Sequence, residues 1–304
     1  MTMKPSGAAS WSPPADSGIT IDWVEANGLT FEVAKTGPQD SEHLALCLHG
    51  FPELHYSWRH QMPVLAELGY KVWAPNLRGY GGTSRPEATK AYRLDNLTAD
   101  VAALIDASRA KEVTLLAHDW GAIIAWHFAI RRVRPLTRLV IMNVPHPHCG
   151  KRELKTWKQL KKSWYMFFFQ IPKLPEMRLG KNDAAIIGHL FRESSVNKAR
   201  FTREEAEPYR AAAARPGAIT AMLNYYRALF QTPDGRQTGD GKVDVPTLVL
   251  WGEKDIAIHI DCLNGTEDYV ADLTVKRFPK ASHWVQQDIP DEVNAELKAW
   301  LPAV

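Results

Sequence analysis

The chain has 304 residues, of which 45% are hydrophobic and 23% are charged, and its formal net charge is +3. This composition is typical of a globular protein with a sizeable core, and the charge is too small to indicate a nucleic acid or a membrane surface as partner. The three cysteines, Cys47, Cys149 and Cys262, are widely spaced and odd in number, which argues against a disulfide framework and favours a reducing, cytoplasmic location. No apolar run approaches the ~20 residues of a membrane span.

The first segment of the chain, residues 1–18, is rich in Pro, Ser and Ala and contains no apolar stretch. It is predicted to be a flexible leader rather than a signal peptide. Residues 19–26 then predict a strand, Asn27-Gly28 is a hairpin signal, and residues 29–34 predict the returning strand.

Strand-like and helix-like segments alternate along much of the remaining chain. Apolar, β-rich runs predict six further strands, at residues 44–48, 71–74, 113–117, 138–142, 247–251 and 274–278. Helical patterns lie between most of them, for example at residues 97–108 and 121–132. This alternation predicts an α/β fold with a mostly parallel eight-stranded sheet and helices on both of its faces. Ligands of such sheets bind at the carboxyl ends of the strands, where we expect the functional residues.

One region interrupts this alternation. Residues 146–231 contain helical patterns but no convincing strand. We interpret them as a helical cap that is inserted into a core formed by residues 19–145 and 232–304. Residues 231–244 are polar and rich in glycine, and they are predicted to return the chain to the core.

The sharpest local pattern joins the strand at 113–117 directly to the helix that follows it. Ala117 and Gly121 are small residues two positions before and two positions after Asp119. This spacing is typical of a nucleophile elbow, a tight and strained turn that exposes one side chain above the sheet. No G-x-S-x-G pattern occurs in the chain, so Asp119 rather than a serine is the predicted nucleophile. The alternative is that Asp119 only caps the following helix.

Two further residues follow strand ends in the chain order that this fold uses, which is nucleophile, acid, histidine. Asp255 lies in the loop after the strand at 247–251, and His283 follows the last strand. They are the predicted orienting acid and general base, against the alternatives of a surface aspartate and a helix-capping histidine. Asn143 also ends a strand, but an amide cannot stabilise an imidazolium as a carboxylate does.

A loop with the sequence His49-Gly50-Phe51-Pro52 follows the strand at 44–48. Such a loop can direct a backbone N–H at a developing oxyanion, together with the N–H of the residue after the nucleophile. The predicted oxyanion hole is therefore formed by the amides of Phe51 and Trp120. An ordinary Gly-Pro turn is the alternative, and the sequence does not tell whether the peptide bond before Pro52 is cis.

Together, these motifs resemble the epoxide hydrolases of the α/β-hydrolase superfamily. The resemblance is carried by residues 49–53, 56–61, 77–81 and 118–121, which read HGFPE, YSWRHQ, LRGYG and HDWG. It extends from Ile19 to the C-terminus, and the pair HGFP and HDWG is its most specific part. Asn76 departs from the family, which often has Asp there, and we expect the change to affect only a turn.

A carboxylate nucleophile suits attack at a saturated carbon, which leaves an alkyl ester on the enzyme. Water activated by the His283–Asp255 pair would then hydrolyse this ester at its carbonyl, where the oxyanion hole acts. Epoxides and alkyl halides both suit the first step. They differ in the leaving group, because an epoxide oxygen needs a proton donor whereas a halide needs N–H dipoles.

A helical pattern at residues 218–230 supplies a candidate proton donor. Tyr226 lies on its apolar stripe, and Tyr225 points about a quarter-turn away. A core tyrosine bonded to a backbone carbonyl is the alternative for Tyr226. The family resemblance implies a second acid tyrosine at Tyr165. It lies at the edge of a predicted apolar face whose members are Leu154, Trp157, Trp164 and Phe168.

Basic residues interleave with that face between positions 151 and 162. They suggest an anionic partner or a membrane surface, but we interpret them as the solvated outer face of a cap helix. The segment His146-Pro147-His148 has no acid or cysteine pattern nearby, so it is interpreted as a loop at the start of the cap rather than a metal site.

We therefore predict an epoxide hydrolase that converts a small apolar epoxide and water to a vicinal diol, without cofactor or metal and with no nucleic acid or membrane partner. Phe51, Trp120 and Trp164 are the predicted substrate-binding residues. A monomer and a homodimer both fit the sequence.

Two kinds of alternative remain open. A haloalkane dehalogenase would hold its halide between Trp120 and Trp164, but Phe51 stands where many dehalogenases carry a halide-binding Asn. A fluoroacetate dehalogenase would have arginines just after Asp119, and these are missing. An inactive relative that only binds a ligand would not need the nucleophile, the acid and the base together.

Overall fold

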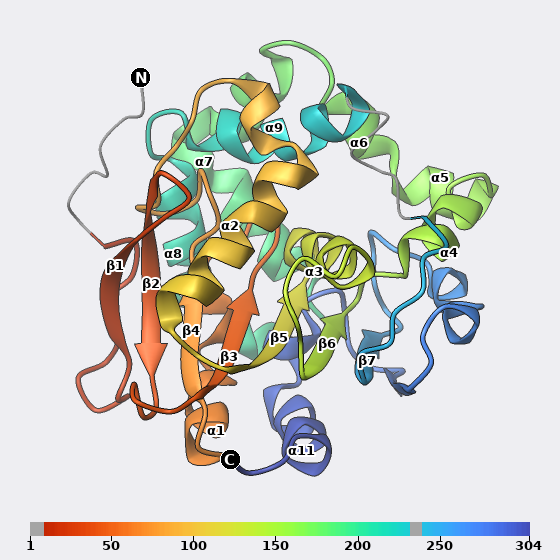
Figure 1. Ribbon diagram of the computed structural model, residues 1–304. Coiled ribbons are helices and arrows are strands. Elements are labelled where there is room, and N and C mark those ends of the chain that lie inside the picture. Colours follow the sequence, from red (N-terminus) through yellow and green to blue (C-terminus); the bar gives the residue numbers. More distant parts are fainter. Residues whose placement is uncertain (1–8, 232–238) are drawn as a thin grey trace.

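A single twisted sheet runs through the computed structural model, which describes residues 9–231 and 239–304 (Figure 1). Its strand order is β1-β2-β4-β3-β5-β6-β7-β8. The pairs β1–β2 and β2–β4 are antiparallel, and the other pairs are parallel. The strands are β1 (Thr20–Ala26), β2 (Leu29–Thr36), β3 (His43–Leu48), β4 (Lys71–Pro75), β5 (Glu112–His118), β6 (Arg138–Met142), β7 (Thr247–Gly252) and β8 (Leu273–Phe278).

The predicted eight-stranded, mostly parallel sheet is confirmed, and each strand begins and ends within two residues of its predicted bounds. The burial of the strands explains why they were recognisable. Every residue of β4 and β7 is buried, so these inner strands are nearly continuous apolar runs. β1 lies at an edge of the sheet, and residues along it alternate between more exposed and more buried positions.

Helices cover both faces of the sheet and enclose two apolar cores. The cores meet along β5, where Leu115 belongs to the first and Leu116 to the second, because successive side chains of a strand point to opposite faces. The first face is covered by α2 (Leu94–Ser108) and α3 (Trp120–Ile130). The second face is covered by α1 (Met62–Glu67), α10 (Val285–Asp288) and α11 (Pro290–Trp300).

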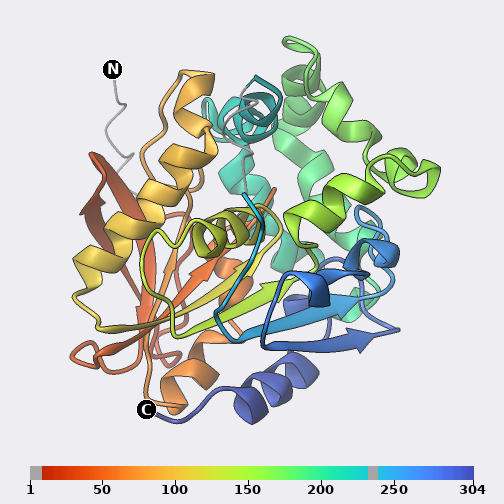
Figure 2. The same cartoon turned by 45° about the vertical axis from the view of Figure 1, so that its right-hand side comes forward.

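Between β6 and β7 the chain forms a separate helical layer, which we call the cap. Figures 1 and 2 show it at the opposite end of the molecule from α1 and α11. The predicted helix at residues 218–230 is confirmed as α9, and the predicted cap boundary at residue 232 lies outside the described residues. The cap helices are α4 (Pro147–Glu153), α5 (Trp157–Lys162), α6 (Trp164–Phe168), α7 (Leu174–Ser194), which is kinked at residues 181–184, α8 (Arg203–Ala213) and α9 (Ala218–Gln231).

The described part of the leader, residues 9–18, contacts the core, and its flexibility stays a prediction. The ring of Trp11 lies 5.1 Å from that of Tyr56, and the amide of Ser10 donates a hydrogen bond to Glu32. Asn76 donates to the hydroxyl of Ser10 at 2.8 Å. One aromatic ring and these polar contacts anchor a segment whose composition alone indicates disorder; residues 1–8 lie outside the described residues. No helix within residues 9–231 and 239–304 is long and apolar enough to cross a membrane.

Candidate active site

Asp119 occupies a strained turn between β5 and α3. Its backbone has φ 47° and ψ −120°, a conformation that non-glycine residues rarely adopt. The side chain makes no capping hydrogen bond to α3, which argues against a purely capping role. Gly121 is required here because a Cβ atom would lie 2.3 Å from the carbonyl oxygen of Leu48. The turn therefore has the geometry of the predicted elbow, with a small residue where two backbones meet.

The predicted acid and base lie beside Asp119. Nδ1 of His283 lies 2.6 Å from Oδ2 of Asp255, and Nε2 of the same ring lies 3.6 Å from Oδ2 of Asp119. All three side chains are buried, and they follow the ends of β5, β7 and β8. A histidine between two carboxylates is oriented by one of them and faces the other, which is the arrangement of a nucleophile–base–acid triad.

Asn143 supports the acid rather than replacing it. It follows β6, and its amide nitrogen donates to Oδ2 of Asp255 at 2.8 Å. Its side-chain oxygen accepts a hydrogen bond from the amide of Gly252 at 2.9 Å. The other carboxylate oxygen of Asp255 accepts from the amides of Ala257 and Ile258, at 2.7 and 2.8 Å. These donors hold the Asp255 carboxylate in its charged form and in one orientation.

The electrostatics of the triad favour a charged histidine in the free protein. Burial lowers the pKa of His283, but the carboxylates of Asp255 and Asp119 outweigh burial and raise it to about 10. Burial raises the pKa of Asp119, but the hydrogen bond and positive charge of His283 bring the net pKa below its ordinary value. At neutral pH the site therefore holds two carboxylates around one imidazolium.

The loop after β3 approaches the nucleophile directly. The amide of Phe51 donates to Oδ1 of Asp119 at 2.5 Å. A Cβ atom on Gly50 would lie 2.2 Å from the same oxygen, so only glycine fits at that position. The peptide bond between Phe51 and Pro52 is cis. Trp120 begins α3, and the role of its amide in an oxyanion hole stays a prediction.

A buried carboxylate that the sequence analysis did not single out connects the three loops that carry Phe51, Asp119 and His283. Oε2 of Glu53 accepts from the amide of Gly50 at 2.8 Å and lies 2.7 Å from Nδ1 of His118. Nε2 of His118 lies 2.8 Å from the carbonyl oxygen of His283, and Gln287 donates to Oε1 of Glu53 at 3.0 Å. This network joins the loop after β3, the turn at Asp119 and the loop that carries His283. Its sequence signal was an acidic residue directly after the His49–Pro52 motif.

Two cap phenols lie near the predicted nucleophile, Asp119. The ring of Tyr226, on α9, lies 5.0 Å from that of Trp120 and 5.4 Å from that of Phe51. The ring of Tyr165, on α6, lies 5.9 Å from that of Tyr226. Burial raises the pKa of both phenols, and the negative charge of Asp119 raises each of them further. Both groups therefore stay protonated at neutral pH and are able to donate.

Tyr225, rather than Tyr226, is the core tyrosine whose hydroxyl bonds a backbone carbonyl. Its hydroxyl donates to the carbonyl oxygen of Arg78 at 2.8 Å inside the core. The hydroxyl of Tyr226 makes no hydrogen bond of this kind within the described residues. The quarter-turn that separates the two positions on α9 thus separates a structural tyrosine from one that faces the site.

The prediction that Trp164 contributes to the site is wrong, because its side chain is 63% exposed. The predicted apolar face around it points outward, since Leu154 and Trp157 are exposed as well. Phe169, which the sequence analysis did not select, is buried in the position expected for Trp164. Its ring lies 5.5 Å from Phe51, 5.0 Å from Tyr226 and 5.6 Å from Tyr165.

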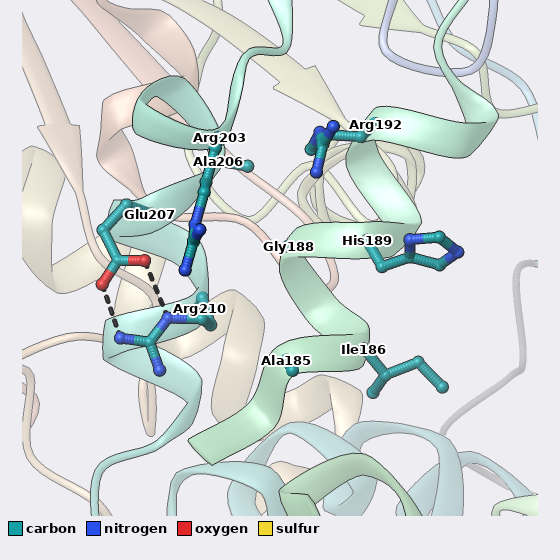
Figure 3. A pocket seen from close by; sticks show the side chains of 9 residues that line it. All are labelled: Ala185, Ile186, Gly188, His189, Arg192, Arg203, Ala206, Glu207 and Arg210. Carbon is teal, nitrogen blue, oxygen red and sulfur yellow. Dashed lines mark hydrogen bonds and ion pairs between the residues drawn. The ribbon is translucent and has the colours of Figure 1, made fainter. Parts of the chain in front are cut away.

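A cleft of about 470 Å³ between α7 and α8 is separate from the triad. Figure 3 shows Arg210 paired with Glu207 on one wall of this cleft, with Arg192 and Arg203 at its end and His189 on the facing helix. None of the predicted catalytic residues lines it. In the described part of the chain, no three His, Cys, Asp or Glu side chains gather as metal ligands.

Comparison with known proteins defines the family. Residues 46–288 match the α/β hydrolase fold family, so the chain belongs to it. An α/β hydrolase superfamily protein of Bacillus subtilis is 35% identical over 285 residues, which are 93% of this chain and 98% of that protein. Epoxide hydrolase 4 of Homo sapiens is 37% identical over 286 residues, which are 91% of this chain and 77% of that protein.

Solved structures agree with this assignment. The crystal structure of the Bacillus megaterium epoxide hydrolase in complex with an inhibitor matches with a TM-score of 0.82 at 30% identity, and the match covers 91% of this chain and 99% of that one. The chain is therefore a hydrolase, and it belongs with the epoxide hydrolases of the α/β hydrolase fold. The predicted fold class and the predicted family are both confirmed.

Proposed function

We propose that the protein converts an apolar epoxide and water to a vicinal diol through a covalent ester on Asp119. One observation carries the proposal. The Asp119 carboxylate lies between the amide of Phe51 and the imidazole of His283, and its charge acts on two cap phenols, the buried Tyr226 and the partly buried Tyr165. An acyl-transfer enzyme of this fold would use a hydroxyl or thiol nucleophile, whereas a carboxylate suits attack at a saturated carbon.

The first step opens the ring. A carboxylate oxygen of Asp119 attacks one epoxide carbon, forms a C–O ester bond and breaks the C–O bond of the ring. Tyr165 or Tyr226 donates a proton to the oxygen that is released, while the other phenol keeps a hydrogen bond to it. Both phenols are protonated at neutral pH because burial and the charge of Asp119 raise their pKa values. The phenolate recovers its proton from the imidazolium of His283 through solvent.

The second step hydrolyses the ester. Ester formation removes the charge of Asp119, so the pKa of His283 falls from about 10 and the neutral ring becomes a base. It takes a proton from water, which attacks the carbonyl carbon of the ester. The amides of Phe51 and Trp120 stabilise the oxyanion that forms on Asp119. The intermediate then collapses, and the bond between its carbonyl carbon and the alkyl oxygen breaks. The second proton of the attacking water passes to that oxygen to complete the diol, which leaves Asp119 as a carboxylate and His283 as an imidazolium beside Asp255.

A haloalkane dehalogenase would need Trp120 and Trp164 as its two halide-binding donors, and only one of them lies at the site. Trp120 is buried at the site, but the indole of Trp164 is turned to the outside of the cap. Phe51 has no side-chain donor to replace it. An inactive ligand-binding relative is disfavoured because the His283–Asp255 hydrogen bond of 2.6 Å and the adjacent Asp119 form a complete nucleophile–base–acid set.

The direct test of the reaction class is a turnover screen of aryl and alkyl epoxides beside haloalkanes of similar size. We expect diol from at least one class of epoxide and no halide release above the buffer rate. Halide release together with no diol from any epoxide would replace this proposal with the dehalogenase. The Asp119→Ala variant is the control for background hydrolysis, because it removes the carboxylate.

A further inference from the structure

The outer rim of the cap exposes an unusual set of large apolar side chains. Trp157 is 69% exposed and Trp164 is 63% exposed. Both lie on the short helices α5 and α6, which Figures 1 and 2 show at the edge of the molecule, away from the sheet. We call this surface the rim patch, and its apolar members are Leu154, Trp157, Leu160, Trp164 and Phe167. Scattered exposed apolar residues are ordinary, but two exposed tryptophans and three other exposed large apolar residues within 14 positions of the chain are not.

The rim patch follows from helical geometry. One non-helical residue, Ser163 with φ −88° and ψ 5°, separates α5 from α6, and its amide still donates to the carbonyl oxygen of Gln159 at 3.0 Å. Trp157 and Trp164 are seven residues apart, about two turns, and therefore share a face. Leu160 and Phe167 fall within about one turn of them on the same side. The exposed side chains thus form one stripe rather than scattered positions.

The opposite, polar side of α5 is the one that packs on the core. Gln159 is buried, its amide nitrogen donates to the carbonyl oxygen of Ala257 at 2.9 Å, and its oxygen accepts from the amide of His259 at 2.7 Å. Lys162 donates to the carbonyl oxygen of Asp255. Polar side chains of α5 therefore form hydrogen bonds with backbone groups of the loop that carries Asp255. This packing fixes the helix with its apolar face outward, which is the reverse of an ordinary surface helix.

The rim patch is strongly basic. Residues 151–162 contain six Lys or Arg and one Glu. Lys158 pairs with Asp261, and Nζ of Lys161 lies 5.0 Å from the centre of the Trp157 ring. Lys151 and Lys155 are exposed and form no ion pair with the described residues. Two copies of this surface would bring like charges together, so its charge favours an anionic surface over self-association.

We propose that the rim patch is a docking site for an anionic lipid surface. Tryptophan and lysine are the side chains that settle at the boundary between headgroups and acyl chains, because the indole has an apolar body with one donor and the ammonium remains in water. Clustered basic residues add attraction to anionic headgroups. The protein would dock peripherally, with α5 and α6 lying along the surface. This inference does not depend on the proposed reaction, because binding is measured without turnover.

The test is flotation of the full chain with vesicles of phosphatidylcholine alone and with vesicles that contain about 30% phosphatidylserine. We expect binding to the anionic vesicles that weakens as salt rises from about 0.05 to about 0.5 M. The triple variant Lys151→Gln, Lys155→Gln, Lys161→Gln should weaken binding roughly five-fold for each charge, so roughly a hundred-fold in total. The double variant Leu154→Ser, Trp157→Ser should also reduce binding, and an unchanged thermal unfolding midpoint and circular dichroism spectrum report an intact fold.

A matched control changes the same net charge elsewhere. Lys111, Lys276 and Lys298 are 71%, 45% and 50% exposed on other elements, and their replacement by Gln should leave vesicle binding unchanged. Equal weakening by this control would assign binding to net charge and overturn the proposal. Absence of binding to anionic vesicles at low salt would also overturn it. So would a concentration-dependent dimer that Leu154→Ser, Trp157→Ser dissociates, because a second copy would then occupy the patch.

Discussion

The two cap tyrosines give the sharpest separation between epoxide chemistry and the alternatives. Replacing Tyr165 and Tyr226 by Phe removes both hydroxyls and keeps both rings. The ring of Tyr226 makes edge contacts with Trp120 at 5.0 Å and with Phe51 at 5.4 Å, and Phe preserves them. Because the hydroxyl of Tyr226 holds no backbone carbonyl within the described residues, its loss should leave the free energy of unfolding nearly unchanged.

The expected kinetic effect follows from the charge that develops on the epoxide oxygen. Each donor to such an oxyanion contributes ~3 kcal/mol, so one Phe substitution should slow ring opening by roughly two orders of magnitude. The double variant should lose roughly four orders if the two donors act independently, and less if one partly compensates for the other. Ester hydrolysis should be spared, since it relies on His283 and the oxyanion loop.

The assay is a single-turnover experiment with enzyme in excess, in which accumulation of the ester and of the diol are followed separately. Tyr225→Phe is the matched control. It leaves the buried carbonyl oxygen of Arg78 without its donor, so it should cost about 1–3 kcal/mol in stability and leave the rate of ring opening unchanged. Ring opening at the parent rate in the Tyr165→Phe, Tyr226→Phe variant would refute the assignment of the acids.

Three further predictions test the electrostatics and the oxyanion loop. In Gly50→Ala the new Cβ would fall 2.2 Å from Oδ1 of Asp119, so the loop that carries Phe51 must move. The kcat for diol formation should therefore drop by roughly two orders of magnitude. An unchanged kcat would contradict the proposed role of this loop. Asp119→Asn imitates the neutral ester, so an NMR titration should find the pKa of His283 well below about 10, and an unchanged pKa would argue against the proposed switch to a base. The raised pKa of His283 stabilises the fold fully below its ordinary value of about 6.5, and this stabilisation is lost as the pH rises toward about 10. Denaturation of the parent and of His283→Gln should be measured between pH 6.5 and about 10. The unfolding free energy should decline with pH in the parent and decline less in the variant. Parallel declines in the two proteins would contradict a raised pKa of His283.

Much of the site was predictable because this fold gathers the ends of parallel strands at one edge of the sheet. Asp119, Asp255 and His283 are far apart in the sequence, yet each lies within about five residues of the end of a strand that the apolar pattern identifies. The close approach of two backbones is also visible in the sequence, because the contact between Gly121 and Leu48 permits only a small residue at position 121. Patterns of this kind predict position along the chain and chemical type.

The residues that were mispredicted or missed depend on which side of a helix faces the core and on contacts with residues far away in the sequence. Periodicity indicates that Trp157 and Trp164 share a face, but not that Gln159 and the loop at 257–259 turn this face to the outside. The Glu53 network was missed because its partners lie 65 and 234 residues away in the sequence. Trp11 escaped notice because one aromatic ring hardly changes the composition of a segment rich in Pro and Ser.

The central claim is that Asp119 forms the covalent ester, and one measurement tests it most directly. His283→Gln removes the base but leaves the nucleophile and the cap phenols, so substrate should open the ring and then stall. Intact-protein and peptide mass spectrometry of this variant after incubation with an epoxide should find one substrate mass added, located on the peptide that contains Asp119. An adduct on a serine or cysteine, or no adduct at saturating substrate while the parent turns over, would contradict the account.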